Sequence, residues 1–175
     1  MKDDFDLSKL KRKKSTRINS KAKGGRFERK VADMFNQRFN TKEFCRTPGS
    51  GAFATTHSLP DYMQIYGDLI TPKDFKFIIE CKSGYNKEGV SSLLNINSNL
   101  SKMIAQALRD SEKCLKRFLL ILGQDRQDPI VITNEDPMNL IYNEPVWALL
   151  NYNGRNLYIL KLSDLLIFPN TFFLH

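Results

Sequence analysis

Two neighbouring apolar segments of this chain carry the residue types best suited to chemistry. The first is Gly67-Asp68-Leu69-Ile70, and the second is Phe77-Ile78-Ile79-Glu80-Cys81-Lys82. Side chains alternate between the two faces of a β-strand, so Glu80 and Lys82 should share one face while Cys81 points to the other. The two segments therefore predict a pair of strands that brings an aspartate, a glutamate and a lysine together.

The turn between these strands predicts how the acids meet. It runs from Pro72 to Lys76 and centres on Asp74, which is equally far in sequence from Asp68 and Glu80, so an antiparallel hairpin would set the two carboxylates opposite each other. Two such charges repel, and a divalent cation between them converts the repulsion into binding. A lysine beside the metal can stabilise a developing anion or help to activate water. The arrangement is typical of a metal-dependent phosphodiesterase.

Two alternatives bear on this site. Charged residues alternate by chance on any solvated strand face, but Phe77, Ile78 and Ile79 predict a largely buried strand, and buried charges need a partner or a metal. Asp61 also lies upstream of Glu80 and is an alternative first carboxylate. Asp68 is favoured because it opens an apolar strand, whereas Asp61 lies in a predicted loop.

An earlier acid is a candidate third member of the site. Apolar residues at helical spacing predict an amphipathic helix over residues 25–39, with Glu28 at the border of its apolar face. Glu28 could look inward towards the sheet as a metal-site residue. The structural alternative is a first-turn acid stabilised by the helix dipole.

The remaining elements define the expected fold. After the helix, the sequence predicts a short strand at 44–46, the two strands described above, a helix capped by Ser98 and ending near 115, and a buried strand at 118–122. Further strands are expected at 129–133, 146–152 and 156–162, the last two joined by an Asn-Gly turn. We expect an α/β fold with a mixed central sheet flanked by helices.

Charge is concentrated at the start of the chain. The 175 residues carry a net charge of +8, and residues 1–30, with twelve Lys or Arg and four Asp or Glu, account for all of it. We expect residues 1–23 to be a flexible basic arm, hinged at Gly24-Gly25, that holds nucleic acid, with Lys11, Arg12, Lys13 and Lys14 as its densest run. A solubilising tail is the alternative.

Cysteine usage and hydropathy predict the compartment. The three cysteines Cys45, Cys81 and Cys114 are widely spaced and form no Cys-x-x-Cys pair, which argues against a disulfide framework or a zinc cluster. No apolar run is long enough for a membrane span, and no secretory segment opens the chain. We expect a soluble cytoplasmic protein of a bacterial, archaeal or phage-infected cell.

Further polar residues are candidates for contacts with a phosphate backbone. Arg46 and Ser50 flank a Pro-Gly-Ser-Gly turn, where glycines allow close approach and arginine supplies a bidentate phosphate contact. Lys102 and Gln106 lie on one face of the second helix. The alternatives are a surface turn and a solvated helix face.

Four segments, in this order, resemble the PD-(D/E)xK nuclease superfamily and within it the archaeal-type Holliday junction resolvases. They are Lys23-Gly24-Gly25-Arg26-Phe27-Glu28-Arg29, Arg46-Thr47-Pro48-Gly49-Ser50-Gly51, Gly67-Asp68-Leu69-Ile70 and Ile79-Glu80-Cys81-Lys82-Ser83, within about residues 23–122. The resemblance implies a restriction-endonuclease-like core at 24–123. Residues 124–175 would then form a C-terminal hairpin and an apolar tail that packs on the core or at a dimer interface.

The resemblance also implies roles for single residues. Glu28, Asp68 and Glu80 match the acidic metal positions, the Cys81 carbonyl would complete the metal shell, and Lys82 matches the lysine that assists attack. The implied cofactor is Mg²⁺, with Mn²⁺ able to substitute and no small-molecule cofactor. The implied partners are branched DNA and a second copy of the chain. The expected DNA-contacting set is Lys11, Arg12, Lys13, Lys14, Lys23, Arg26, Arg29, Arg46, Ser50 and Lys102.

The chain departs from the resolvase pattern in three places. About sixteen residues separate the Ser-Gly turn from Asp68, the C-terminal part has no recognised counterpart, and the basic arm is longer. These departures fit a small phage or virus enzyme of recombination and repair, and they also fit a restriction-like or repair nuclease that cuts flaps, ends or specific sites. A non-catalytic DNA- or RNA-binding protein on a nuclease fold is the alternative from another class.

Overall fold

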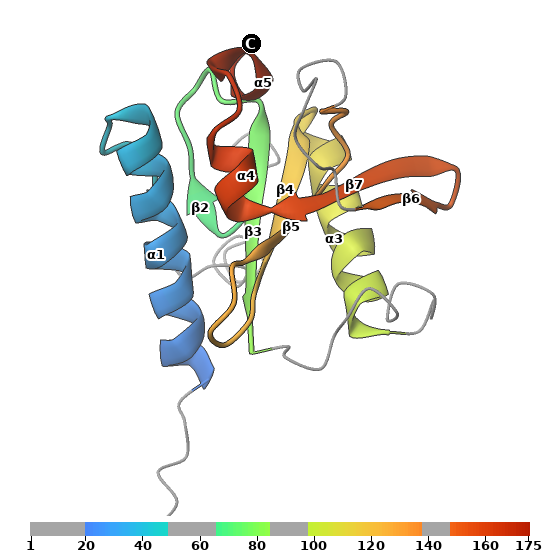
Figure 1. Cartoon of the computed structure of the whole chain (residues 1–175), viewed down its shortest axis with the longest axis horizontal. Helices are drawn as coiled ribbons and strands as arrows, with labels where there is room; N and C mark the ends of the chain where they lie inside the picture. The colour runs from blue at the N-terminus through green and yellow to red at the C-terminus, as the bar shows by residue number, and fades with distance from the viewer. Residues whose placement is uncertain (1–19, 49–65, 85–97, 138–147) are drawn as a thin grey trace, which may run out of the picture.

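The computed structural model describes residues 20–48, 66–84, 98–137 and 148–175. Along these ranges, helices and strands follow in the order expected for the core, an α-β-β-β-α-β series, and then continue (Figure 1). The elements are α1 (Ser20–Phe39), β1 (Cys45–Arg46), β2 (Leu69–Ile70), β3 (Phe77–Ser83), α3 (Asn99–Cys114), β4 (Arg117–Gly123), β5 (Ile130–Thr133), β6 (Ala148–Tyr152), β7 (Arg155–Lys161), α4 (Leu162–Leu166) and α5 (Asn170–Phe173).

Five of the strands form one mixed sheet in the order β3-β4-β5-β7-β6. β3 and β4 run parallel, joined by the α3 crossover, and the remaining neighbours are antiparallel. β1 and β2 form a separate antiparallel pair beside β3. The expected fold class is confirmed, and the C-terminal strands extend the same sheet that contains Glu80 and Lys82.

Helices cover both faces of this sheet (Figure 1). On one face, α1, α4 and α5 pack against alternate residues of β3, namely Phe77, Ile79 and Cys81. On the other face, α3 packs against Ile78 and its neighbours on β4 and β7. The alternation of a strand thus sends Glu80 and Lys82 to the α3 side and the Cys81 thiol to the α1 side.

The C-terminal tail packs on the core. Phe172 and Phe173 are fully buried, and Phe173 lies in a cluster of aromatic rings with Phe35 and Phe75. Arg38 of α1 holds the segment from outside: its guanidinium donates to the Leu166 and Phe168 carbonyls and to the Asn170 side chain. The tail therefore completes the α1 face of the sheet.

Two local predictions are confirmed by backbone geometry. Asn153 and Gly154 both have positive φ, 51° and 80°, as a primed two-residue hairpin turn requires. The Ser98 side chain caps α3 by accepting a hydrogen bond from the Ser101 amide at 3.1 Å.

One boundary differs from the expectation. α1 begins at Ser20, so Gly24 and Gly25 lie inside the helix and not at a hinge before it. Gly25 is buried because the Arg46 guanidinium lies against it, and a Cβ there would be 3.3 Å from the Arg46 Cζ atom. Close packing, and not a turn, explains this glycine. No helix within the described ranges is long and apolar enough to cross a membrane.

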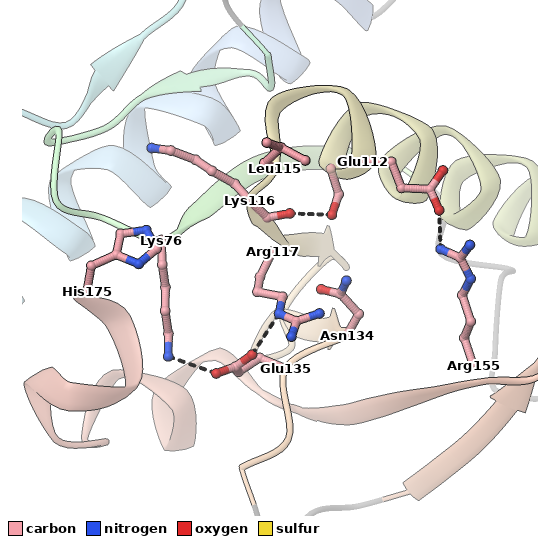
Figure 2. Close-up of a pocket in the computed structure, with 10 residues that line it drawn as sticks. Lys76, Glu112, Leu115, Lys116, Arg117, Asn134, Glu135, Arg155 and His175 are labelled. Atoms are coloured by element: carbon pink, nitrogen blue, oxygen red, sulfur yellow. Dashed lines mark hydrogen bonds and ion pairs between the residues drawn. The ribbon is translucent and has the colours of Figure 1, made fainter.

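A hollow of about 500 Å³ lies at the end of the sheet where β3 and β4 begin (Figure 2). Glu135, one of its lining residues, bridges Lys76 at 2.8 Å and Arg117 at 3.0 Å, and Arg155 pairs with Glu112. The two ion pairs of Glu135 link Lys76, just before β3, and Arg117, the first residue of β4, to the loop after β5. The hollow is at the opposite end of β3 from Lys82.

Truncation of Phe173 tests whether the tail belongs to the core. Phe173→Ala should lower the free energy of unfolding by about 3–5 kcal/mol, because it removes a fully buried ring and leaves a cavity. Ile167→Ala in the same tail should change it by less than about 0.5 kcal/mol, since Ile167 is 66% exposed. Urea unfolding followed by circular dichroism measures both, and equal effects would contradict this packing.

Candidate active site

Asp68 lies beside the outer edge of β3. Among the described strands, β3 forms a ladder with β4 on one side, and on the other side the Asp68 amide donates to the Ile79 carbonyl at 2.8 Å. Gly67 permits this approach: its φ is +86°, and a Cβ there would lie 2.7 Å from the Ile79 carbonyl oxygen. The conformation and the contact both require glycine at this position.

The expected hairpin between the two strands is wrong in detail. β2 pairs with β1, with Arg46 opposite Leu69, and no ladder joins β2 to β3 among the described residues. The ladder partner of Glu80 is Leu120 of β4. β1 competes successfully for β2 because Thr47 fastens the pair, its amide donating to the Asp68 carbonyl at 3.0 Å and its hydroxyl to the Gly67 carbonyl at 3.2 Å.

The residues that the hairpin was expected to bring together nevertheless meet. The Lys82 ammonium lies 3.0 Å from the Glu80 carboxylate and 3.6 Å from that of Asp68. Asp68 and Glu80 are 8% and 4% exposed. Two buried carboxylates thus share one ammonium at the outer edge of the sheet.

This crowding changes the acidity of Glu80. Burial, followed by the charge of Asp68, raises the pKa of Glu80 from 4.5 to about 7, against the opposing effect of Lys82. The charge of Asp110, on α3, also raises this pKa. A second positive charge at this position would relieve the repulsion.

Lys82 is held in its charged form. Burial works against the ammonium, but the carboxylates of Glu80 and Asp68 together outweigh it and raise the pKa of Lys82. Of the two roles expected for this lysine, the cationic role fits the metal-free protein, since a protonated amine can donate to an anion but cannot accept a proton from water.

The Cys81 backbone faces the same edge as Asp68. Its amide donates to Asp68 Oδ2 at 2.8 Å, and the amide and carbonyl of one strand residue point to the same side of the strand. The Cys81 carbonyl is therefore directed towards the space beside Asp68. Burial, then the charges of Asp68, Glu28 and Glu80, raise the pKa of the Cys81 thiol, so this side chain stays a neutral core residue.

Glu28 is buried on α1, as the helical spacing predicted. Its carboxylate contacts the Arg46 Nε atom, and the Glu28 side chain is only 10% exposed. Its charge also raises the pKa of the buried Cys81 thiol. The structure therefore pairs Glu28 with Arg46, while Asp68 and Glu80 share Lys82.

The predicted DNA-contacting residues divide into three sets. Arg26 and Arg29 are exposed on α1 in the turns around Glu28, and Lys102 is exposed in the first turn of α3. Lys23 forms an ion pair with Asp125 at 2.9 Å. Five further members of the set lie outside the described residues: Lys11, Arg12, Lys13, Lys14 and Ser50. The alternative metal ligand Asp61 lies outside them too. Arg46 is paired with Glu28.

Two residues near the site were not predicted. Asp110 lies one turn beyond Gln106 on α3, a spacing that could have placed it on a helix face near the strand. Thr47 gave no signal, because its contribution is to fasten backbone that is distant in sequence.

The donor set suits a divalent cation. Carboxylate and carbonyl oxygens are the ligands that Mg²⁺ and Mn²⁺ prefer, and Asp68, Glu80 and the Cys81 carbonyl supply them around one edge. Within the described ranges, no group of three or more His, Cys, Asp or Glu side chains is arranged to hold a metal. The reason is visible in the pairing, since Lys82 engages two of the acids and Arg46 engages the third.

The raised pKa of Glu80 makes stability depend on pH. Folding without metal should weaken as pH rises from about 4.5 to above 7, because the folded protein still holds a proton that the unfolded chain has lost. The loss should reach about 3 kcal/mol. Glu80→Gln should abolish this slope and exposed Glu43→Gln should retain it, in urea unfolding with a chelator. If the pH dependence of stability persists in Glu80→Gln, titratable groups other than Glu80 cause it.

Comparison with known proteins agrees with this geometry. Residues 19–161 match the model of a family described as "Phage putative PDDEXK endonuclease". The chain is also 34% identical over 128 residues to Protein D14 of Escherichia phage T5, covering 69% of this chain and 75% of that protein. No solved structure matches the chain. The family match includes the C-terminal strands that had no recognised counterpart, and the chain belongs to this phage family of PD-(D/E)xK endonucleases.

Proposed function

We propose that this nuclease cuts branched DNA, with the four-way junction as its preferred substrate and Mg²⁺ as its cofactor, replaceable by Mn²⁺. The observation that carries the proposed chemistry is the pair of buried carboxylates, Asp68 and Glu80, around the Lys82 ammonium. Such a group is unfavourable in a protein unless further positive charge joins it.

The chemistry follows from the charges of these residues. A divalent cation bound to Asp68, Glu80 and the Cys81 carbonyl would supply the Lewis acid and lower the pKa of the attacking water. The carboxylates hold that site by charge and by the fixed backbone of β3. Lys82, kept protonated by its two neighbours, donates to the phosphoryl oxygens as negative charge gathers on them in the transition state. Glu28, beside Cys81, is the proposed third acid.

Exposed cations on the two helices support a proposed DNA-binding face. Arg26 and Arg29 are exposed on α1, which covers one face of the sheet, and Lys102 is exposed on α3, which covers the other. The basic run at residues 11–14 precedes α1 and adds further charge. Arginine and lysine that neutralise phosphates release counterions, which gives affinity without reading bases.

The preference for branched DNA and a homodimeric assembly rest on the resemblance to junction resolvases. A two-fold dimer would set two copies of Lys82 against symmetric strands of a junction.

The proposed location is the cytoplasm of a bacterial host cell. The three free cysteines, Cys45, Cys81 and Cys114, suit the reducing conditions there.

A cleavage panel tests the activity and the substrate together. Labelled four-way junction, flap, linear duplex and single-stranded DNA are incubated with Mg²⁺ and protein. We expect paired symmetric nicks on the junction, abolished by Asp68→Asn and reduced about 10²–10³-fold by Lys82→Ala. Lys73→Ala, a matched change of an exposed lysine before β3, should leave the rate unchanged.

The outcomes separate the alternatives. Cleavage of flaps or linear duplex in preference to the junction would keep the nuclease and replace the substrate. No cleavage of any substrate, with salt-sensitive DNA binding intact, would identify a binding protein on a nuclease fold. Tighter binding to duplex RNA than to every DNA form would point to an RNA partner.

Salt dependence tests the proposed DNA-binding face. Arg26→Ala and Arg29→Ala should each reduce the slope of log K against log salt by about one, since each removes one phosphate contact. Lys73→Ala should not change it. Fluorescence anisotropy with a labelled junction, at several salt concentrations and without divalent metal, measures the slopes. Unchanged slopes in both arginine variants would place the DNA elsewhere.

A further inference from the structure

Within the part of the chain that the structure describes, Glu28 forms an ion pair with a cation from another element. The carboxylate is buried on α1, and the Arg46 Nε atom from β1 contacts it. Removing the cation from a buried pair leaves an uncompensated charge, which is strongly unfavourable. In the protein without DNA or metal, Arg46 therefore stabilises the charge of Glu28.

Arg46 is placed so that it also reaches the solvent. Its side chain is 31% exposed, compared with 10% for Glu28. The guanidinium lies against Gly25, where the missing Cβ leaves room for it along α1. A guanidinium presents five donors in a planar fork, and it binds phosphate through two of them at once. The group that neutralises Glu28 is thus also suited to bind a DNA phosphate.

The position of Arg46 links it to the metal-binding edge. Arg46 lies opposite Leu69 in the β1–β2 pair, and the next residue, Thr47, donates its amide to the Asp68 carbonyl. α1, which carries Glu28, packs on the face of β3 that includes Cys81, and the Cys81 amide donates to Asp68 Oδ2 at 2.8 Å. A cation bound beside Asp68 and the Cys81 carbonyl would be an alternative partner for Glu28.

We infer that Arg46 couples DNA binding to metal binding by exchanging partners. Without DNA it holds Glu28; a backbone phosphate then draws the guanidinium away, and the released carboxylate joins the cation held at Asp68 and Glu80. Arg46 is a positioning residue in this scheme, and the inference rests on the proposed nuclease function. Coupling of this kind is reciprocal, so the metal must also strengthen DNA binding.

Calorimetry with Ca²⁺, an oxygen-liganded cation, tests the exchange without measuring activity. Wild-type protein should bind Ca²⁺ about tenfold more tightly with saturating four-way junction than without DNA. Arg46→Gln should bind Ca²⁺ in the absence of DNA more tightly than the wild type does, and its gain from DNA should be smaller than the tenfold gain of the wild type. Arg46→Lys keeps a cation beside Glu28 and should retain the weaker DNA-free affinity.

The inference is wrong if, without DNA, Arg46→Gln binds Ca²⁺ no more tightly than the wild type does. Should this variant fail to fold in thermal melting, R46Q/E28Q removes both charges and provides the second test. Its gain in Ca²⁺ affinity from DNA should be smaller than that of the wild type, and a gain as large as that of the wild type would overturn the inference.

The wild-type cleavage panel distinguishes the two levels of the proposal. Suppose that the wild type cuts DNA but its Ca²⁺ affinity changes neither with DNA nor on substitution of Arg46. That result overturns the partner exchange and leaves the nuclease function in place. A wild type that neither cuts DNA nor binds Ca²⁺ overturns the nuclease function and the exchange with it.

Discussion

Two carboxylates lie within reach of one ammonium at the outer edge of β3, and burial removes both of them from water. In a medium of low polarity, the repulsion between Asp68 and Glu80 is only partly offset by Lys82, and the raised pKa of Glu80 is its direct consequence. The surrounding structure holds this arrangement in place. Gly67 allows the close approach, Thr47 fastens the strand that carries Asp68, and the parallel pairing with β4 fixes the direction of Glu80.

The same physical problem is solved twice around Cys81. On the α3 side an ammonium neutralises two acids, and on the α1 side a guanidinium neutralises one. The two cations differ in kind: Lys82 is a compact charge on the central sheet itself, whereas Arg46 is a planar fork on a short outer strand. In the proposed mechanism the first cation stays with the reacting phosphate, and the second changes partners.

The sequence predicted those features that depend on local pattern. The apolar run around Glu80 predicted a buried strand, the Ser98 cap predicted the start of α3, and Asn153-Gly154 predicted the hairpin turn. It did not predict the partner of β2, because the choice between β1 and β3 depends on hydrogen bonds from Thr47, twenty-one residues before Asp68. It left open whether Glu28 looks inward, and it did not predict Arg46 beside it, since Arg46 comes from a separate strand, eighteen residues further along the chain. The catalytic roles of all these residues stay predictions.

The long-range closure of the α1 face also has a kinetic consequence. Arg38 reaches carbonyl groups 128 and 130 residues further along the chain, and the ring of Phe35 meets that of Phe173. Contacts between distant parts of a chain form slowly, because the loop between them must close first. α1 also packs on β1 and β3, and its ring Phe35 meets Phe44 and Phe75 as well as Phe173. The contacts of Arg38 and Phe35 with the tail are therefore expected to form after those that α1 makes with β1 and β3.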